Sequence, residues 1–476
     1  MKSRIVFLTI SRLTLLCFVV ILNTASLRAQ DQYNLKFKIE GLKDTTVYLG
    51  YYYGESTYLQ DTTRINDRGE FAFTKSTKLT EGMYFLVLNN TKIFDIAIGK
   101  DQDFTIETST SDYIRAMKIS GDIDNELFHK SLLFNGERYM KAQPLLAVLN
   151  DSTASTNEKN NAQKSFDLLN KEVRNYQKKV IEENPDAIVS KLFIGQNRVE
   201  VPNTPNGESD SRFKLNYYKK HFWDNFNLSD EVMIRLPEPF YFRKMEEYLD
   251  NLFVQSSDSL TPIIDYLVEK SSHNQETYKY MVWNLTLKYQ NPKFMGLDQI
   301  FIHIYDKYFE TGEMDYWANE TLKKNLKERA DQLRKSLIGN IAPNMIMLDS
   351  KLAPKSMHDI KNKYTVLYFY DPDCSHCKEE TPRLNEFYKK TKFDVEVFAV
   401  CSDTSMVKMN NYIEENNLTW ISVNGPRTYT GAYQESYDAN TTPTIFLLDE
   451  NKRIITKKLE AAKLEDFIRN YEKSQN

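Results

Sequence analysis

Two cysteines near the C-terminus carry the clearest chemistry in the sequence. Cys374 and Cys377 form a C-x-x-C motif that follows an apolar run ending at Tyr370. A helix is predicted from about Cys374 to Thr391, so the motif lies where a buried strand passes into a helix. The N-terminus of a helix stabilises a thiolate through its unpaired N–H groups and its macrodipole. We therefore expect Cys374, on the first helical turn, to attack a disulfide and Cys377 to resolve the mixed disulfide.

Charged neighbours of the motif act on the thiolate in opposite directions. His376 can hydrogen-bond or pair with the Cys374 thiolate, which would stabilise the reduced form and make the disulfide more oxidising. The alternative for His376 is an exposed imidazole. Asp371 and Asp373 would raise the pKa of the thiol if they point inward, although Asp373 could instead cap the helix. The sequence leaves open which effect is larger.

The elements around the motif predict an α/β domain over residues 337–476. Apolar runs alternate with helical segments, in the order 366–370, 374–391, 395–400, 405–416 and 444–448, followed by a strand near 453–459 and a closing helix at 463–472. Continuous apolar runs between helices are typical of strands in a sheet that is covered on both faces.

Residues 338–476 resemble the thioredoxin superfamily, and specifically the exported TlpA/ResA-type thiol–disulfide oxidoreductases. The motifs that carry the resemblance occur in the family's order: Gly339, Ala342-Pro343, the strand into Cys374 and Cys377, Glu380, Pro382 and Thr442-Pro443-Thr444. The resemblance covers the C-terminal third of the chain and implies a thioredoxin-like fold with a redox-active dithiol. We expect no metal and no bound cofactor.

The resemblance also implies roles for residues outside the cysteines. Pro443 should follow a cis peptide bond and lie beside Cys374, where the backbone of Thr442 can pair with a substrate chain. A proline before a strand can also be a simple strand start. Glu380 should be a partly buried carboxylate that moves protons for Cys377, the alternative being a solvated helical glutamate.

The sequence departs from the thioredoxin pattern near the motif. Tyr370 and Asp373 stand where thioredoxins carry two tryptophans, and Ser375-His376 replaces their Gly-Pro. These departures leave the reaction class unchanged but bear on the redox potential. Thioredoxin-like sites span about −270 to about −120 mV, so the direction of electron flow stays open.

The remaining cysteine and the histidines give no sign of a metal site. Cys401 ends an apolar run, so we expect a buried and inert residue, with a third redox thiol as the alternative. The sequence holds six histidines with no metal-ligand spacing, and the C-x-x-C lacks a second ligand pair. No glycine-rich phosphate loop or Ser/His/Asp signature is present either.

The two upstream regions differ in hydrophobic period. Residues 30–122 alternate apolar and polar positions between turns, which predicts an antiparallel β-sandwich. Residues 123–336 have apolar residues at helical spacing, interrupted by two prolines and a glycine within 201–207, and predict an all-α domain. Both regions resemble, more weakly, the uncharacterised β-rich and helical domains that precede such oxidoreductases in Bacteroidetes-type envelope proteins. That similarity implies no activity.

The first 29 residues predict a secretory signal peptide with cleavage after Ala29. Basic residues precede an apolar run at 13–22, which is too short to span a bilayer. The expected location is the periplasm or cell envelope, with no transmembrane span in the mature chain. Of 62 basic and 66 acidic residues, cleavage would remove four basic ones and leave a net charge of −8. Such a chain is a poor candidate for binding nucleic acid or anionic lipid.

These features predict a thiol–disulfide oxidoreductase that acts on protein disulfides of the envelope, as a reductase. The family resemblance implies a membrane-held electron donor. One alternative is a non-enzymatic envelope scaffold with a vestigial thioredoxin module. A peroxiredoxin-like peroxidase is disfavoured because it would need a threonine three residues before Cys374, where Asp371 stands.

Overall fold

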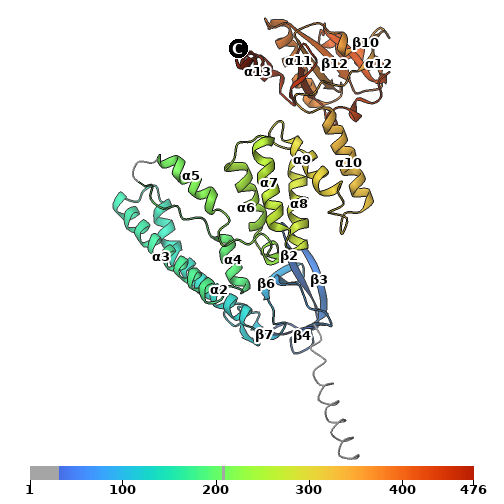
Figure 1. Cartoon of the computed structure of the whole chain (residues 1–476). Helices are drawn as coiled ribbons and strands as arrows, with labels where there is room; N and C mark the ends of the chain where they lie inside the picture. Colours follow the sequence, from blue (N-terminus) through green and yellow to red (C-terminus); the bar gives the residue numbers. More distant parts are fainter. Residues whose placement is uncertain (1–31, 206–208, 476) are drawn as a thin grey trace, which may run out of the picture. The chain divides into compact units, whose positions relative to one another are not determined.

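The computed structural model describes residues 32–205 and 209–475 (Figure 1). The chain forms two compact units, residues 1–248 and 249–476. The first unit holds the β-rich region and helices up to most of α6, and the second holds α7 to α10 and the C-terminal α/β domain. The predicted signal peptide, residues 1–29, lies outside the described residues. In the two described stretches, no helix has the length and apolar character needed to cross a bilayer.

The N-terminal region is built of two four-stranded sheets, ordered β4-β1-β7-β8 and β3-β2-β5-β6. Its strands are β1 (Tyr33–Glu40), β2 (Thr46–Tyr53), β3 (Ser56–Arg64), β4 (Glu70–Lys75), β5 (Gly82–Leu88), β6 (Thr91–Ile98), β7 (Asp103–Ser109) and β8 (Lys118–Ser120). Leu35, Phe37 and Ile39 of β1 are buried and join residues of the other sheet in one hydrophobic cluster. The predicted period-two pattern is confirmed.

The expectation that all these strands are antiparallel was wrong for one pair. β1 and β7 run parallel, with Leu35 opposite Phe104 and Phe37 opposite Ile106. Parallel neighbours need a long crossover connection. The chain supplies it by forming β2 to β6 between the two strands. The turns of the sequence are local signals and carry no information on this non-local pairing.

The middle of the chain is helical, as predicted. Its helices are α2 (Ile123–Asn150), α3 (Thr156–Glu183), α4 (Ile188–Gln196), α5 (Asp210–His221), η1 (Glu231–Ile234), α6 (Phe240–Asn251), α7 (Ser257–Ser271), α8 (Gln275–Gln290), α9 (Asp298–Ile304), η2 (Tyr305–Phe309) and α10 (Glu320–Lys335). The first of them begins after Asp122, whose side chain accepts hydrogen bonds from the backbone N–H groups of Asp124 and Asn125. The predicted break is seen at residues 197–205, which form no regular element.

The C-terminal domain is a seven-stranded sheet with the order β10-β9-β13-β12-β11-β14-β15. Its elements are β9 (Ile346–Asp349), β10 (Pro354–Ser356), η3 (Met357–Asp359), β11 (Tyr364–Tyr370), α11 (Ser375–Lys390), β12 (Val395–Cys401), α12 (Met406–Glu415), β13 (Ile421–Thr428), η4 (Tyr433–Glu435), β14 (Thr444–Leu448), β15 (Ile454–Lys457), η5 (Ala461–Lys463) and α13 (Leu464–Gln475). β11 is parallel to β12 and antiparallel to β14.

Strand β11 lies in the interior of this sheet, between β12 and β14, and is buried on both faces. Val366 and Tyr368 belong to one hydrophobic cluster, while Leu367 and Phe369 belong to a second one. Successive side chains of a strand point to opposite faces, so the two clusters lie on the two sides of the sheet. This confirms the predicted sheet covered on both faces, and β11 leads directly into the C-x-x-C motif.

Candidate functional site

Cys374 stands at the start of helix α11. The helix begins at Ser375, and Cys374 is its N-cap with φ −71° and ψ 123°. The expectation that Cys374 lies on the first helical turn was therefore off by one residue, because helix limits are set by backbone hydrogen bonds that the sequence does not show. Cys374 is partly exposed, and both it and Cys377 are free cysteines.

The surroundings of Cys374 favour its thiolate. Desolvation alone would raise the pKa of this thiol, but hydrogen bonds from the backbone N–H and the thiol of Cys377, from Thr442 and from the backbone N–H of His376 hold it below its ordinary value. The unpaired N–H groups of the first turn of α11 thus act on the sulfur as predicted. Cys374 is the more acidic cysteine of the motif.

Cys377 has the opposite environment. Its side chain is fully buried on the inner face of α11. Burial raises the pKa of the Cys377 thiol to about 12, even though the backbone N–H of Asp371 points at its sulfur from 3.5 Å. Cys377 therefore stays protonated at neutral pH and needs a proton acceptor before it can attack.

The loop at Thr442-Pro443 lies against the motif. The Thr442–Pro443 peptide bond is cis, as the resemblance implied. The Cys374 thiol donates a hydrogen bond to the Thr442 carbonyl oxygen, with an S–O distance of 3.3 Å. Both loop residues are half-buried. The fold thus joins two segments that are 68 positions apart in the sequence.

Glu380 is buried one turn after Cys377. Its carboxylate accepts hydrogen bonds from the backbone N–H of Ala461 and from the Arg383 guanidinium, the latter at 3.3 Å. The alternative of a solvated glutamate is wrong, since only 7% of the residue is exposed. A carboxylate oxygen has more than one acceptor position, so these two bonds leave Glu380 able to accept a further hydrogen bond.

The two carboxylates before the motif are bound to groups other than the sulfur. The Asp371 carboxylate accepts hydrogen bonds from the Ser402 hydroxyl and from the backbone N–H of Asp373, both at 2.8 Å. Asp373 does not cap the helix, because its carboxylate forms an ion pair with Lys408 at 2.6 Å. His376 is exposed, and among the described residues its side chain has no hydrogen-bond partner. His376 therefore matches the alternative of an exposed imidazole, and its ring does not pair with the thiolate.

The sequence did not predict that Lys408 lies near the motif. It lies on α12 and pairs with two carboxylates, Asp373 at 2.6 Å and Asp403 at 3.0 Å. The hydrogen bonds to both carboxylates raise the pKa of Lys408. The ammonium group offsets the negative charge next to Cys374. No sequence pattern marks this lysine, because 35 residues separate it from Asp373.

A buried tyrosine–threonine cluster beneath Cys377 was also missed. The Tyr412 hydroxyl donates to the Cys377 carbonyl at 3.1 Å and lies 2.8 Å from the Thr381 hydroxyl. Tyr368 bonds the same threonine at 2.7 Å. Thr381, four residues after Cys377 and so on the same helix face, is the one member that the sequence could have indicated. The cluster holds the first turns of α11 against β11 and α12.

Cys401 is fully buried, as predicted. Burial raises the pKa of its thiol to about 11. It lies opposite Tyr370 in the β11–β12 pair, inside a hydrophobic cluster. Within residues 32–205 and 209–475, no group of three or more His, Cys, Asp or Glu side chains could hold a metal ion.

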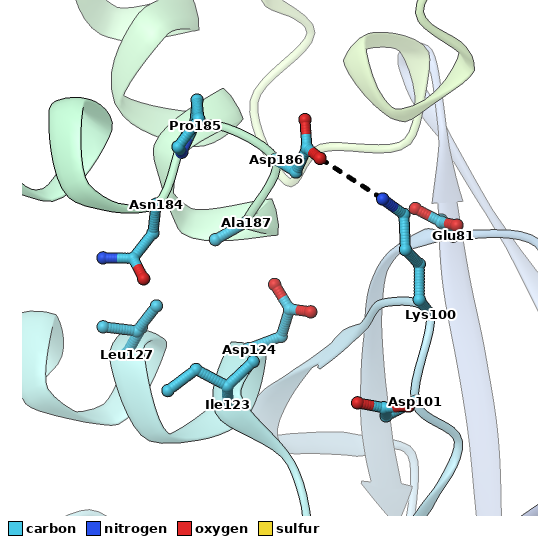
Figure 2. A pocket seen from close by; sticks show the side chains of 10 residues that line it. All are labelled: Glu81, Lys100, Asp101, Ile123, Asp124, Leu127, Asn184, Pro185, Asp186 and Ala187. Atoms are coloured by element: carbon cyan, nitrogen blue, oxygen red, sulfur yellow. Dashed lines mark hydrogen bonds and ion pairs between the residues drawn. The ribbon is translucent and has the colours of Figure 1, made fainter.

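A recess of about 250 Å³ lies in the first unit, between the β-rich region, helix α2 and residues 184–187, which connect α3 to α4. Figure 2 shows Lys100 reaching Asp186 across its rim, and the two charges are 3.3 Å apart. Asp124 inside it accepts a hydrogen bond from the backbone N–H of Ile188 at 2.7 Å. The acidic group thus anchors the start of α4, and its role is structural.

Family models match three regions of the chain. Residues 362–454 match a thioredoxin-like family. Residues 152–334 and 33–128 match two domains of unknown function, DUF5106 and DUF4369. The thioredoxin-like match contains the C-x-x-C motif and the Thr442-Pro443 loop.

Three similar proteins each cover part of the chain. The thiol–disulfide oxidoreductase ResA of a Bacillus cereus strain is 28% identical over 125 residues, which are 26% of this chain and 70% of the relative. A solved domain of a possible thiol–disulfide isomerase from Cytophaga hutchinsonii is 33% identical, with 29% of this chain and 95% of that structure covered and a TM-score of 0.28. A thioredoxin-like protein from Bacteroides caccae is 18% identical over 58% of this chain and 99% of its own, with a TM-score of 0.46.

Alkylation should distinguish the cysteines of the reduced protein. At neutral pH we expect iodoacetamide to modify Cys374 first, because its pKa is lowered and its side chain is partly exposed, whereas Cys377 and Cys401 are buried and have pKa values of about 12 and about 11. The Cys374 rate should rise with pH and level off above its pKa. Peptide mass spectrometry of timed samples measures each site. Equal rates at Cys374 and Cys377 would contradict this assignment.

Replacing Lys408 should make Cys374 less acidic. The Lys408→Met variant leaves the Asp373 and Asp403 carboxylates without their cation, and their negative charge then disfavours the nearby thiolate. The pH dependence of thiolate absorbance should show a raised pKa, and the effect should shrink at high salt. Lys390→Met is the matched control, since this exposed lysine pairs with Glu386 at the far end of α11, about 22 Å along the axis. If Cys374 had the same pKa in both variants, the proposed effect of the Lys408 charge on the thiolate would be refuted.

Proposed function

We propose that this chain, which belongs to the thioredoxin-like family through its C-terminal domain, is a thiol–disulfide oxidoreductase that reduces disulfides of proteins. The observation that carries the proposal is the pair of unlike thiols: an acidic, partly exposed Cys374 next to a protonated, buried Cys377. Such a pair gives one nucleophile and one resolving group. The two roles follow from the different burial of the side chains: the partly exposed Cys374 can reach a substrate, and the buried Cys377 can reach only Cys374.

In the first step, the Cys374 thiolate attacks one sulfur of the substrate disulfide. A bond forms between Cys374 and that sulfur, the substrate S–S bond breaks, and the other substrate sulfur leaves as a thiolate that takes up a proton. The Thr442 carbonyl, 3.3 Å from the Cys374 sulfur, marks where a substrate backbone can lie alongside the loop. The substrate is held as an added strand while the sulfurs exchange.

In the second step, Cys377 loses its proton and attacks the sulfur of Cys374. The intramolecular disulfide forms and the second substrate thiol is released, so that two electrons have passed to the substrate. We assign Glu380 as the group that takes the Cys377 proton, because it is buried on the same helix and keeps acceptor capacity. His376 acts on the site through its backbone N–H, which helps to lower the pKa of Cys374.

The oxidised protein needs two electrons from outside to act again. The sequence shows no nucleotide site, so we propose a membrane-held donor that reduces the Cys374–Cys377 disulfide by the same exchange. The predicted signal peptide supports the periplasm or cell envelope as the proposed site of the reaction. Protein disulfides of that compartment are the proposed substrates.

The competing functions fit the site less well. A scaffold with a vestigial module would not need an accessible cysteine of lowered pKa, and Cys374 has both properties. A peroxidase of the peroxiredoxin type would need a threonine at position 371. The carboxylate of Asp371 is instead bound to Ser402.

Single cysteine variants test the proposed reaction. With dithiothreitol as the source of electrons, the wild type should reduce the disulfides of insulin. Cys374→Ser should abolish this activity, because no other accessible sulfur of the protein can attack the substrate. Cys377→Ser should instead accumulate mixed disulfides at Cys374, visible by mass spectrometry under non-reducing conditions. Cys401→Ala is the control and should keep the wild-type rate.

Activity that survives Cys374→Ser would overturn the proposal. The reductase direction is tested by equilibrating the wild type with glutathione: a potential near the thioredoxin value of about −270 mV supports a reductase, and one near about −120 mV supports an oxidant.

Removing the charge of Glu380 should slow only the second step. Glu380→Gln keeps a carbonyl oxygen for the Ala461 N–H but cannot accept a proton at working pH. Attack by Cys377 on a preformed mixed disulfide should slow by about 100-fold at neutral pH. Stopped-flow release of a chromogenic thiol measures this rate. Glu379→Gln, the exposed neighbour, should behave as wild type. An unchanged rate of this second step in Glu380→Gln would exclude the assigned role.

A further inference from the structure

The segment that leads into the Thr442-Pro443 loop, residues 434–440, is held by helix α10 of the helical region. Both belong to the second compact unit, and Figure 1 shows α10 leading up to the C-terminal domain. The side-chain amide of Gln332 donates to the backbone carbonyls of Gln434 at 2.5 Å and Tyr437 at 3.3 Å and to the Asn440 side chain at 3.3 Å. One half-buried side chain thus fixes three points of this segment.

Arg329, one turn earlier on α10, adds an ion pair. Its guanidinium donates to the Asp438 carboxylate at 2.6 Å, and only 12% and 7% of the two side chains are exposed. The same guanidinium donates to the Gln290 carbonyl at 3.1 Å and the Asn291 side chain at 3.2 Å. The contacts with Gln290 and Asn291 therefore hold the Arg329 guanidinium in the position from which it binds Asp438.

Asp438 connects this contact to the strands that follow the loop. It also pairs with Lys458 at 2.5 Å, and these two partners hold the pKa of Asp438 below its ordinary value despite the desolvation. The backbone N–H of Lys458 in turn donates to the Ile445 carbonyl of β14 at 2.7 Å. β14 begins directly after Pro443.

A buried ion pair holds the same strands from a second helix. Lys457 of β15 pairs with Asp298 at the start of α9, and both side chains are about 95% buried. The Lys457 ammonium also donates to the Ser336 carbonyl at 2.8 Å, just after α10. Lys457 lies opposite Phe446 of β14. The chain before and after the Thr442-Pro443 loop is thus tied to α9 and α10.

We propose that α10, through Arg329 and Gln332, positions the Thr442-Pro443 loop for pairing with the backbone of a protein substrate. This gives the uncharacterised helical region a part in the exchange reaction. The inference rests on the proposed function. Arg329 and Gln332 touch neither the reacting sulfurs nor the expected substrate, so they are positioning residues. Their loss should affect substrates that pair with the loop backbone, and spare small disulfides that need only Cys374.

The test compares a protein disulfide with a small one in the full-length protein. For Gln332→Ala and Arg329→Met we expect the KM for insulin to rise about fivefold with little change in kcat, as the loss of roughly one hydrogen bond predicts. The rate with 5,5′-dithiobis(2-nitrobenzoic acid) should stay within about twofold, and Arg329→Lys should recover part of the insulin KM. Asn325→Ala and Lys324→Met, exposed positions on the same helix, are the matched controls.

The outcomes separate this inference from the proposed function. A wild type that reduces neither substrate would overturn both. An active wild type with an unchanged insulin KM in both variants would overturn only the role of α10. Equal losses on insulin and the small disulfide would show a general loss of folded protein and would also overturn it. Gln332→Ala removes no buried charge, so it keeps the test valid if Arg329→Met fails to fold.

Discussion

The chemistry of the C-terminal domain depends on the burial of one strand on both faces. Every residue of β11 from Tyr364 to Tyr370 is buried, and alternate side chains enter two separate hydrophobic clusters. A slip by one residue would exchange the two faces, so the register of the strand is strongly fixed. The end of β11 then sets where α11 begins. Residues without any reactivity thus determine where Cys374 lies.

The electrostatics at the sulfur follow from that placement. Three carboxylates, those of Asp371, Asp373 and Asp403, lie in the segments around the motif and would oppose a thiolate. Each is bound elsewhere: Asp371 by Ser402, and the other two by Lys408. The N–H groups at the start of α11 therefore act on Cys374 without a strong opposing charge. At Cys377, one turn further, complete burial outweighs the one backbone N–H group that points at its sulfur, so its pKa is raised.

How much the sequence could predict depended on distance along the chain. The C-x-x-C after an apolar run, the alternation in β1 and the helical period of the middle region are local patterns, and the structure confirms them. The cis bond before Pro443 came from the family resemblance. Lys408 and Tyr412 could not be predicted, because they reach the motif from 31 to 35 residues away and nothing in the local sequence marks them. The parallel pairing of β1 with β7 was missed for the same reason.

The contacts of α9 and α10 with the α/β domain bear on where one domain ends and the next begins. The family matches leave residues 335–361 between a helical region and a thioredoxin-like region, as if the two were separate modules. Lys457 and Asp298 argue against that separation, since each is buried and its charge is compensated by the other. Removing one partner of a buried ion pair leaves an uncompensated charge and typically costs about 3–5 kcal/mol. The Arg329–Asp438 pair adds a second buried contact, in which Lys458 also pairs with the carboxylate. The helical segment from α9 to α10 and the sheet that carries the Thr442-Pro443 loop therefore form one energetic unit, so a sequence change in α10 acts on the same structure that presents the disulfide to Cys374.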